Sequence, residues 1–247
     1  RITPPLGYSY VHADCYPPAK FNDGSLLIPA TADNRNTGLA VHRSQLEQLD
    51  QSVVVLYGSE DNGLTWHYVS EVMRDPTGHG RPVYANLMLL PSGRLQCYAL
   101  NNGGIRTALH LNHSDDGGYT WSEPRSIVDW GQSPWTKLSR DPIWSGAISG
   151  PRYRSCWPLL LRDGRIAVLF DRRQLPGGIG MIMSEDEGST WSTEVVIRGD
   201  ASDWDLGYVV GTELDDGRIF AAYYFMEEDG NNFGGTRHMA ASIFELK

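Results

Sequence analysis

The sequence predicts an all-β protein made of repeated four-stranded antiparallel sheets, which is the organisation of a β-propeller. Two repeated signals support this prediction. An eight-residue phrase, Ser-x-Asp-x-Gly-x-Thr-Trp, occurs three times, at 59–66, 114–121 and 184–191. A turn signal with Gly near its centre, set between two apolar runs, occurs four times, at 22–26, 91–95, 162–166 and 215–219. Turn signals repeated at intervals of tens of residues indicate stacked equivalent units.

The eight-residue phrase, which we call the box, has a physical interpretation as a turn. Its Asp can accept backbone N–H bonds across a tight turn, and its Gly can adopt the left-handed conformation. Its Trp can pack between neighbouring units. We therefore interpret each box as a staple for a hairpin and not as a site of chemistry.

The order of the two signals predicts the order of strands in each unit: inner strand, Gly turn, second strand, third strand, box and outer strand. The turn Gly and the box Asp are 23 residues apart in the second unit and 22 in the third. In the first unit the separation is 37 residues, because of an insertion around 37–50. The predicted blades of this single domain, 1–247, are 9–75, 80–130, 150–200 and 205–247.

The fourth predicted blade reaches a third strand at 239–244 and has no box after it. A last blade of this kind commonly receives its outer strand from the other end of the chain. We therefore expect the blades to be part of a closed ring.

Composition excludes several classes of function. The 247 residues include 21 basic and 30 acidic side chains, a formal charge of −9, which argues against a nucleic-acid surface. The three cysteines, Cys15, Cys97 and Cys156, have no metal-binding spacing and cannot all pair. No apolar run is long enough for a membrane span. The acidic stretch 227–232 is interpreted as a solvated hairpin tip and not as a calcium site. We expect no cofactor and no metal.

A bladed chain with these boxes resembles the sialidase superfamily, whose members are six-bladed propellers with Asp-boxes, also called BNR repeats. The resemblance covers most of the chain and implies the fold. It implies activity less directly, because the boxes lie on the outer rim, away from the site. If the four blades correspond to the last four of six, the first two are absent from this chain. A second chain or a further segment would then complete the propeller.

The resemblance also implies a set of catalytic groups: a tyrosine nucleophile, a glutamate that activates it, an aspartate acid/base and three arginines on the substrate carboxylate. Tyr208, preceded by Asp205, resembles the nucleophile at the start of the last inner strand. Arg172 and Arg173 resemble a carboxylate-binding position. The alternatives are an aromatic side chain filling the funnel, for Tyr208, and a surface loop pair, for the arginines.

The second predicted blade departs from the family pattern. The places where the family presents a glutamate and an arginine contain Asn86 and Asn101. An amide cannot act as a base toward a tyrosine and cannot make a charge-assisted clamp on a carboxylate. Both positions remain candidates for polar contacts with a substrate.

Titratable residues also precede the inner strands, where a propeller forms its ligand funnel. They are His12, Asp14, His79, Arg81, 152–154 and Asp205. Arg81, Arg154 and Arg172 could bind an acidic sugar, with His12 or His79 and Tyr208 handling protons. The alternative for each histidine is a surface loop position without a role.

The function predicted from these residues is an exo-acting carbohydrate-active enzyme, of the sialidase-like glycoside hydrolase type, that releases a terminal acidic sugar from a glycan. One alternative is elimination at a rhamnose–glucuronate linkage, because a His/Tyr pair suits proton abstraction beside a carboxylate neutralised by arginine. The other is a glycan-binding propeller without catalysis. The expected partner is an acidic oligosaccharide, and a secreted or periplasmic location is left open.

Overall fold

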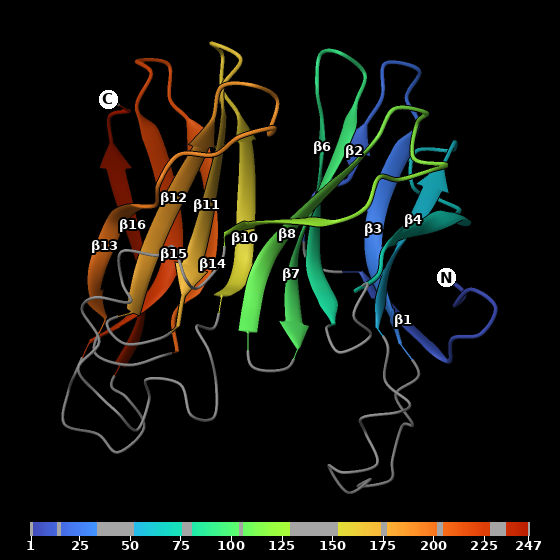
Figure 1. Ribbon diagram of the computed structural model, residues 1–247, viewed down its shortest axis with the longest axis horizontal. Coiled ribbons are helices and arrows are strands. Elements are labelled where there is room, and N and C mark those ends of the chain that lie inside the picture. Colours follow the sequence, from blue (N-terminus) through green and yellow to red (C-terminus); the bar gives the residue numbers. More distant parts are fainter. Residues whose placement is uncertain are drawn as a thin grey trace, which may run out of the picture. The chain divides into compact units, whose positions relative to one another are not determined.

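The computed structural model describes residues 2–13, 16–33, 52–75, 81–103, 106–128, 153–173, 177–201, 205–227 and 236–246. Within these ranges the regular secondary structure consists of β-strands, and no helix is present (Figure 1). The all-β prediction is therefore confirmed. The described residues contain no long apolar helix of the kind that crosses a membrane.

The strands of the described ranges form four antiparallel sheets. The first contains β1 (Tyr10–Ala13), β2 (Ala19–Lys20), β3 (Leu26–Asp33), β4 (Val53–Ser59) and β5 (His67–Met73). The second contains β6 (Pro82–Leu89), β7 (Leu95–Gly103), β8 (Arg106–Ser114) and β9 (Arg125–Val128). The third contains β10 (Tyr153–Leu160), β11 (Ile166–Arg172), β12 (Gly177–Ser184) and β13 (Val195–Ala201). The fourth contains β14 (Gly207–Glu213), β15 (Ile219–Glu227) and β16 (Thr236–Phe244).

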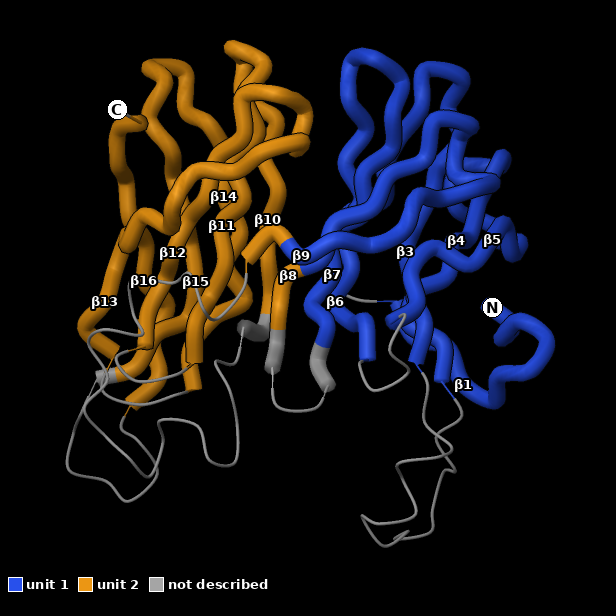
Figure 2. The backbone as a smooth tube through the Cα atoms, viewed as in Figure 1, with its two compact units in different colours: residues 1–104, 110–126 blue, residues 105–109, 127–247 orange. Residues whose placement is uncertain are grey.

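The chain divides into two compact units, 1–104 with 110–126 and 105–109 with 127–247 (Figure 2). Each unit has its own apolar core. In unit 1, Leu56 of the first sheet and Leu95 of the second belong to one buried cluster. In unit 2, Leu169 of the third sheet and Phe225 of the fourth belong to a separate buried cluster. Burial of such side chains stabilises each unit, at roughly 1.5–3 kcal/mol for each large one.

The four Gly turns form hairpins as predicted. The backbone N–H of Gly164 donates to the carbonyl of Leu161 at 2.9 Å, and that of Gly217 donates to Leu214 at 2.9 Å. Gly164 has φ +90° and Gly217 has φ +86°, a conformation that glycine adopts without a steric penalty. These turns lie at one end of each sheet, so the opposite end is where the first and second strands present their candidate functional residues.

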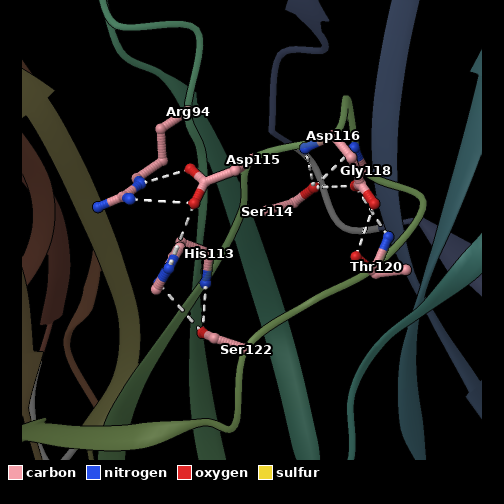
Figure 3. Close-up of polar contacts among 8 residues, drawn as sticks. All are labelled: Arg94, His113, Ser114, Asp115, Asp116, Gly118, Thr120 and Ser122. Atoms are coloured by element: carbon pink, nitrogen blue, oxygen red, sulfur yellow. Dashed lines mark hydrogen bonds and ion pairs between the residues drawn. The ribbon is translucent and has the colours of Figure 1, made fainter.

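The boxes are turns held by one carboxylate (Figure 3). Asp116 accepts bonds from the backbone of Thr120 at 2.9 Å and from its hydroxyl at 2.6 Å. Trp121 donates from Nε1 to Gly118 at 3.0 Å and contacts Ser70 of β5 at 3.2 Å, so it joins the second sheet to the first. Asp61 and Asp186 bind Thr65 and Thr190 in the same way. The staple interpretation is confirmed.

The fourth sheet has three strands in the described residues, and no outer strand follows β16. The six-bladed ring, the single domain over 1–247 and the completing segment stay predictions. Cys97 and Cys156 are buried free cysteines, while Cys15 lies outside the described residues. Most of the acidic stretch 227–232 also lies outside them.

Candidate active site

Tyr208 lies on a β-bulge at the start of β14. Gly207 pairs with Tyr224 of β15 and Val210 pairs with Ala222, so two residues of β14 lie opposite one of β15. A bulge breaks the alternation of a strand and redirects a side chain. Tyr208 has φ +50°, which a bulky residue rarely adopts, and the residue is 44% exposed.

Arg154 occupies the equivalent bulge on β10. Tyr153 pairs with Arg172 and Cys156 pairs with Phe170, so Arg154 and the next residue lie opposite a single residue of β11. The strand position of Arg154 therefore matches that of Tyr208, while its side chain lies outside the described residues.

Asp171 of β11 is the buried centre of the site. It is fully buried and accepts hydrogen bonds from the backbone N–H of Ser155, at 2.9 Å, and from the Ser155 hydroxyl. Burial raises the pKa of Asp171 to about 6, although Arg173 and the bonds from Ser155 act in the opposite direction. Gly207 covers this carboxylate, and a Cβ at that position would lie 2.6 Å from Asp171 Oδ2.

Arg173 connects two carboxylates and a phenol. Its side chain is 7% exposed, and its Nη2 donates to the hydroxyl of Tyr224. Its Nη1 lies 3.6 Å from Asp205 Oδ1, and its Nε lies 3.5 Å from Asp171 Oδ2. A buried guanidinium needs such partners, because an unpaired charge away from water is costly.

Tyr224 and Arg237 hold Asp205 from two sides. Tyr224 donates its hydroxyl hydrogen to Asp205 Oδ1 at 2.6 Å, and Arg237 Nε donates to Asp205 Oδ2. Burial acts to raise the pKa of Asp205, but the bonds from Tyr224 and Arg237 outweigh it and the pKa is lowered. Burial and the bond to Asp205 raise the pKa of Tyr224. The proton of this pair therefore stays on Tyr224.

The ring of Tyr208 stacks on this network. The centroids of the Tyr208 and Tyr224 rings are 6.0 Å apart, with an angle of 28° between the planes. The guanidinium carbon of Arg173 lies 5.8 Å from the centroid of each ring, within reach of a cation–π attraction. The arrangement places an exposed phenol above a buried and paired set of charges.

The structure brings together three of the residues proposed from sequence, Tyr208, Asp205 and Arg173. The phenol that donates a hydrogen bond to Asp205, however, is that of Tyr224. The sequence analysis did not single out Tyr224. Arg172 is buried on β11, where alternation directs it to the opposite face from Asp171. Tyr224 lies on β15 and Arg237 lies on β16. No sequence motif marks either position.

The other proposed residues, apart from Arg154, belong to unit 1. His12 lies on β1 with its ring centroid 5.6 Å from that of Tyr10. Asn86 is buried on β6, and Arg81 directly precedes that strand. Asn101 Nδ2 donates to Asp75 Oδ1 at 3.3 Å. His79 and Asp14 lie outside the described residues. Their convergence with Tyr208 in one funnel stays a prediction.

A second polar cluster, around the box at 114–121 in unit 1, is structural (Figure 3). Ser122 Oγ lies 3.1 Å from His113 Nδ1, and His113 Nε2 lies 3.9 Å from Asp115. In the third sheet Ser192 binds the backbone of Met183, as Ser122 binds that of His113. Because the serine repeats without a histidine, its role is to hold the strand after the box. Among the described residues no group of three or more His, Cys, Asp or Glu could hold a metal.

Solved structures with a similar fold include a protein of unknown function from Dyadobacter fermentans, with 24% identity and a TM-score of 0.68. The match covers 93% of this chain and 52% of that protein. An alpha-L-arabinanase of Penicillium chrysogenum complexed with arabinobiose has 18% identity and a TM-score of 0.64, covering 97% of this chain and 64% of the other. A Hadza microbial sialidase has 21% identity and a TM-score of 0.57, with coverages of 93% and 45%.

The chain has a sialidase-like fold at this coarse level. It spans about half to two thirds of the length of the structures it matches. An alpha-L-arabinofuranosidase of Fusarium graminearum and an ulvan lyase also match, so several kinds of carbohydrate-active enzyme share the fold. No protein-family model matches the sequence, and no curated protein sequence matches it.

Proposed function

We propose that this chain belongs to an exo-acting carbohydrate-active enzyme that releases a terminal acidic sugar from a glycan, with Tyr208 as its reactive residue. The observation that carries the proposal is the exposed phenol of Tyr208, at φ +50°, above the buried network of Arg173, Asp171 and Asp205. Strained backbone at an exposed reactive group is typical of functional sites.

Two tyrosines lie in this site, and their environments differ. Tyr224 donates its hydroxyl hydrogen to Asp205 and has a raised pKa, so it is a poor nucleophile in the resting protein. Tyr208 is 44% exposed and can reach a substrate. We assign nucleophilic attack on the anomeric carbon to the Tyr208 oxygen. The new carbon–oxygen bond forms as the glycosidic carbon–oxygen bond breaks, the phenol proton passes to the leaving oxygen, and water then releases the sugar from Tyr208. Tyr224 orients Asp205 and Arg173.

Arg237 supports an acidic sugar as the substrate. Its side chain is 45% exposed, and its Nε is bonded to Asp205. Its two terminal nitrogens make no further hydrogen bond to the described residues. A guanidinium with both terminal nitrogens available can bind a carboxylate in a bidentate manner. The substrate-binding roles of Arg172, Arg81 and Arg154, and the proton-transfer role of His12, belong to the same proposal.

One observation favours lyase chemistry as the second candidate. The Arg173 guanidinium carbon lies 5.8 Å from the Tyr208 ring centroid, so the exposed phenol lies beside a cationic group. The Tyr208 oxygen could act as the base that removes the proton beside a uronate carboxylate. The sugar product would then carry a carbon–carbon double bond, formed as the glycosidic carbon–oxygen bond breaks.

Product analysis separates these candidates. The protein is incubated with sialyllactose and with a rhamnosyl-glucuronate oligosaccharide. Release of free sialic acid supports the hydrolase, and an unsaturated uronate, detected by ultraviolet absorbance and mass, supports the lyase. Binding of either oligosaccharide without any product would overturn the enzymatic proposal in favour of a glycan-binding protein.

A further inference from the structure

Unit 1 contains a tyrosine in the same backbone setting as Tyr208. On β6, Tyr84 and Ala85 together lie opposite the single residue Ala99 of β7. On β14, Tyr208 and the residue after it lie opposite Tyr223 in the same way. Tyr84 has φ +54° and Tyr208 has φ +50°. The two bulges therefore share register, residue type and conformation.

The local fold does not require a tyrosine at this conformation. Among the described residues four non-glycine residues have positive φ, and two of them, Asn62 and Glu187, lie in box turns where the chain must reverse. Tyr84 and Tyr208 lie in strands. Glycine or asparagine would adopt the left-handed conformation at lower cost than an aromatic residue. An unfavourable residue that persists in this conformation points to a use for its side chain.

The neighbours of Tyr84 hold its backbone in place. Ala85 is buried in the core of unit 1. Asn101, which pairs with Pro82 across β6 and β7, donates its side-chain amide to the buried Asp75. Tyr84 itself is only partly buried. The strand is thus fixed on both sides of the bulge, and the partly buried Tyr84 side chain extends from a rigid backbone.

We propose that Tyr84 forms a sugar-binding subsite in unit 1, in which its ring stacks on the C–H face of a pyranose residue of the glycan. A rigid aromatic ring loses little conformational entropy on binding and supplies a flat apolar surface that matches a sugar face. The inference rests on the proposed function, because the sugar belongs to the same class of acidic oligosaccharide.

Calorimetric titration of the whole chain with sialyllactose and with the rhamnosyl-glucuronate oligosaccharide tests the subsite. Tyr84→Asn and Tyr84→Gly, which both tolerate φ +54°, should weaken binding about tenfold and should unfold at the same temperature as the original chain or higher. Tyr84→Phe keeps the aromatic ring and should therefore weaken binding much less. Tyr119→Ala removes a tyrosine that is 72% exposed, in the box at 114–121 of the same unit, and serves as the matched control.

The outcomes are separable. Unchanged binding in Tyr84→Asn and Tyr84→Gly would overturn the subsite, and so would a lower unfolding temperature in both, because the tyrosine would then be structural. Absence of binding by the original chain to either oligosaccharide would overturn both the subsite and the proposed function. Binding that depends on Tyr84, without turnover of any substrate, would overturn the enzymatic proposal alone.

Discussion

The backbone of Gly207 lies directly on the carboxylate of Asp171, so that a side chain at position 207 would place its Cβ 2.6 Å from Asp171 Oδ2. Gly207 has φ +130°, which non-glycine residues rarely adopt. This contact ties the start of β14 to the end of β11. It also sets the position of the next residue, Tyr208.

Gly207→Ala should therefore destabilise unit 2 strongly. We expect a loss of about 3 kcal/mol or more, because the new methyl group meets a buried carboxylate as well as an unfavourable φ. Urea denaturation measures the change. The matched control is Gly217→Ala in the same sheet, where φ is +86° and no atom lies within 4 Å of the new Cβ. It should cost about 1 kcal/mol, and equal losses in the two variants would contradict the contact.

Asp171 should make the stability of the protein fall as pH rises from about 4 to 6. Its folded pKa is raised by burial to about 6 from an ordinary value of 3.8, so in this window the folded state binds more protons than the unfolded state. Below about pH 4, Asp171 contributes about 3 kcal/mol to the free energy of unfolding, and this contribution is lost as pH rises through about 6. Asp171→Asn should remove this part of the pH dependence, measured by urea denaturation at pH 4, 5, 6 and 7. An unchanged slope would show that Asp171 titrates normally.

The box carboxylates should have the opposite pH dependence. Hydrogen bonds from the threonine of each box, first from its side chain, lower the pKa of Asp61, Asp116 and Asp186 to about 2. Their contribution to stability is present above about pH 4 and is lost as pH falls through about 2. Asp116→Asn should lower the melting temperature by several degrees at pH 7 and flatten the acid limb of the stability curve.

Asp115→Asn is the control for the box. Asp115 is next in sequence and pairs with Arg94 at 2.7 Å on the surface (Figure 3). Exposed ion pairs contribute little to stability. A melting temperature lowered equally by both substitutions would contradict the assignment of the staple to Asp116.

Arg237→Ala should raise KM for an acidic sugar substrate about tenfold or more, since a bidentate guanidinium–carboxylate pair would be lost. The change in kcat should be smaller. Arg218→Ala is the control, because Arg218 pairs with Asp216 at 2.7 Å at the opposite, Gly-turn end of the same sheet. Steady-state kinetics measures both. Equal KM values for the two variants would remove Arg237 from the substrate-binding residues.

Sequence reasoning predicted the strands well because their boundaries are marked by local chemistry. A glycine at a hairpin and an aspartate in a box act within a few residues, so Gly164 and Asp116 indicate their turns without knowledge of the rest of the chain. That strand order, together with the family resemblance, predicted Tyr208 and the pair Arg172 and Arg173 as site residues. In the structure Tyr208 and Arg173 lie in one network, whereas Arg172 is directed to the opposite face of β11 from Asp171.

The partners of these residues could not be predicted in the same way. Tyr224 and Arg237 meet Asp205 through the pairing of β14, β15 and β16, and nothing in their local sequence marks them. The bulges at Tyr84 and Tyr208 are also invisible to periodicity, because one extra residue in a strand changes the direction of side chains without changing composition. The burial of Asp171 depends on Gly207, which is 36 residues later in the chain.

The most direct test of the central claim compares Tyr208→Phe with the original chain on the substrate identified by product analysis. If Tyr208 is the reactive residue, kcat should fall on the order of 10³-fold while the Kd of the substrate, measured by calorimetry, changes little. An unchanged kcat in Tyr208→Phe would contradict the assignment of catalysis to Tyr208.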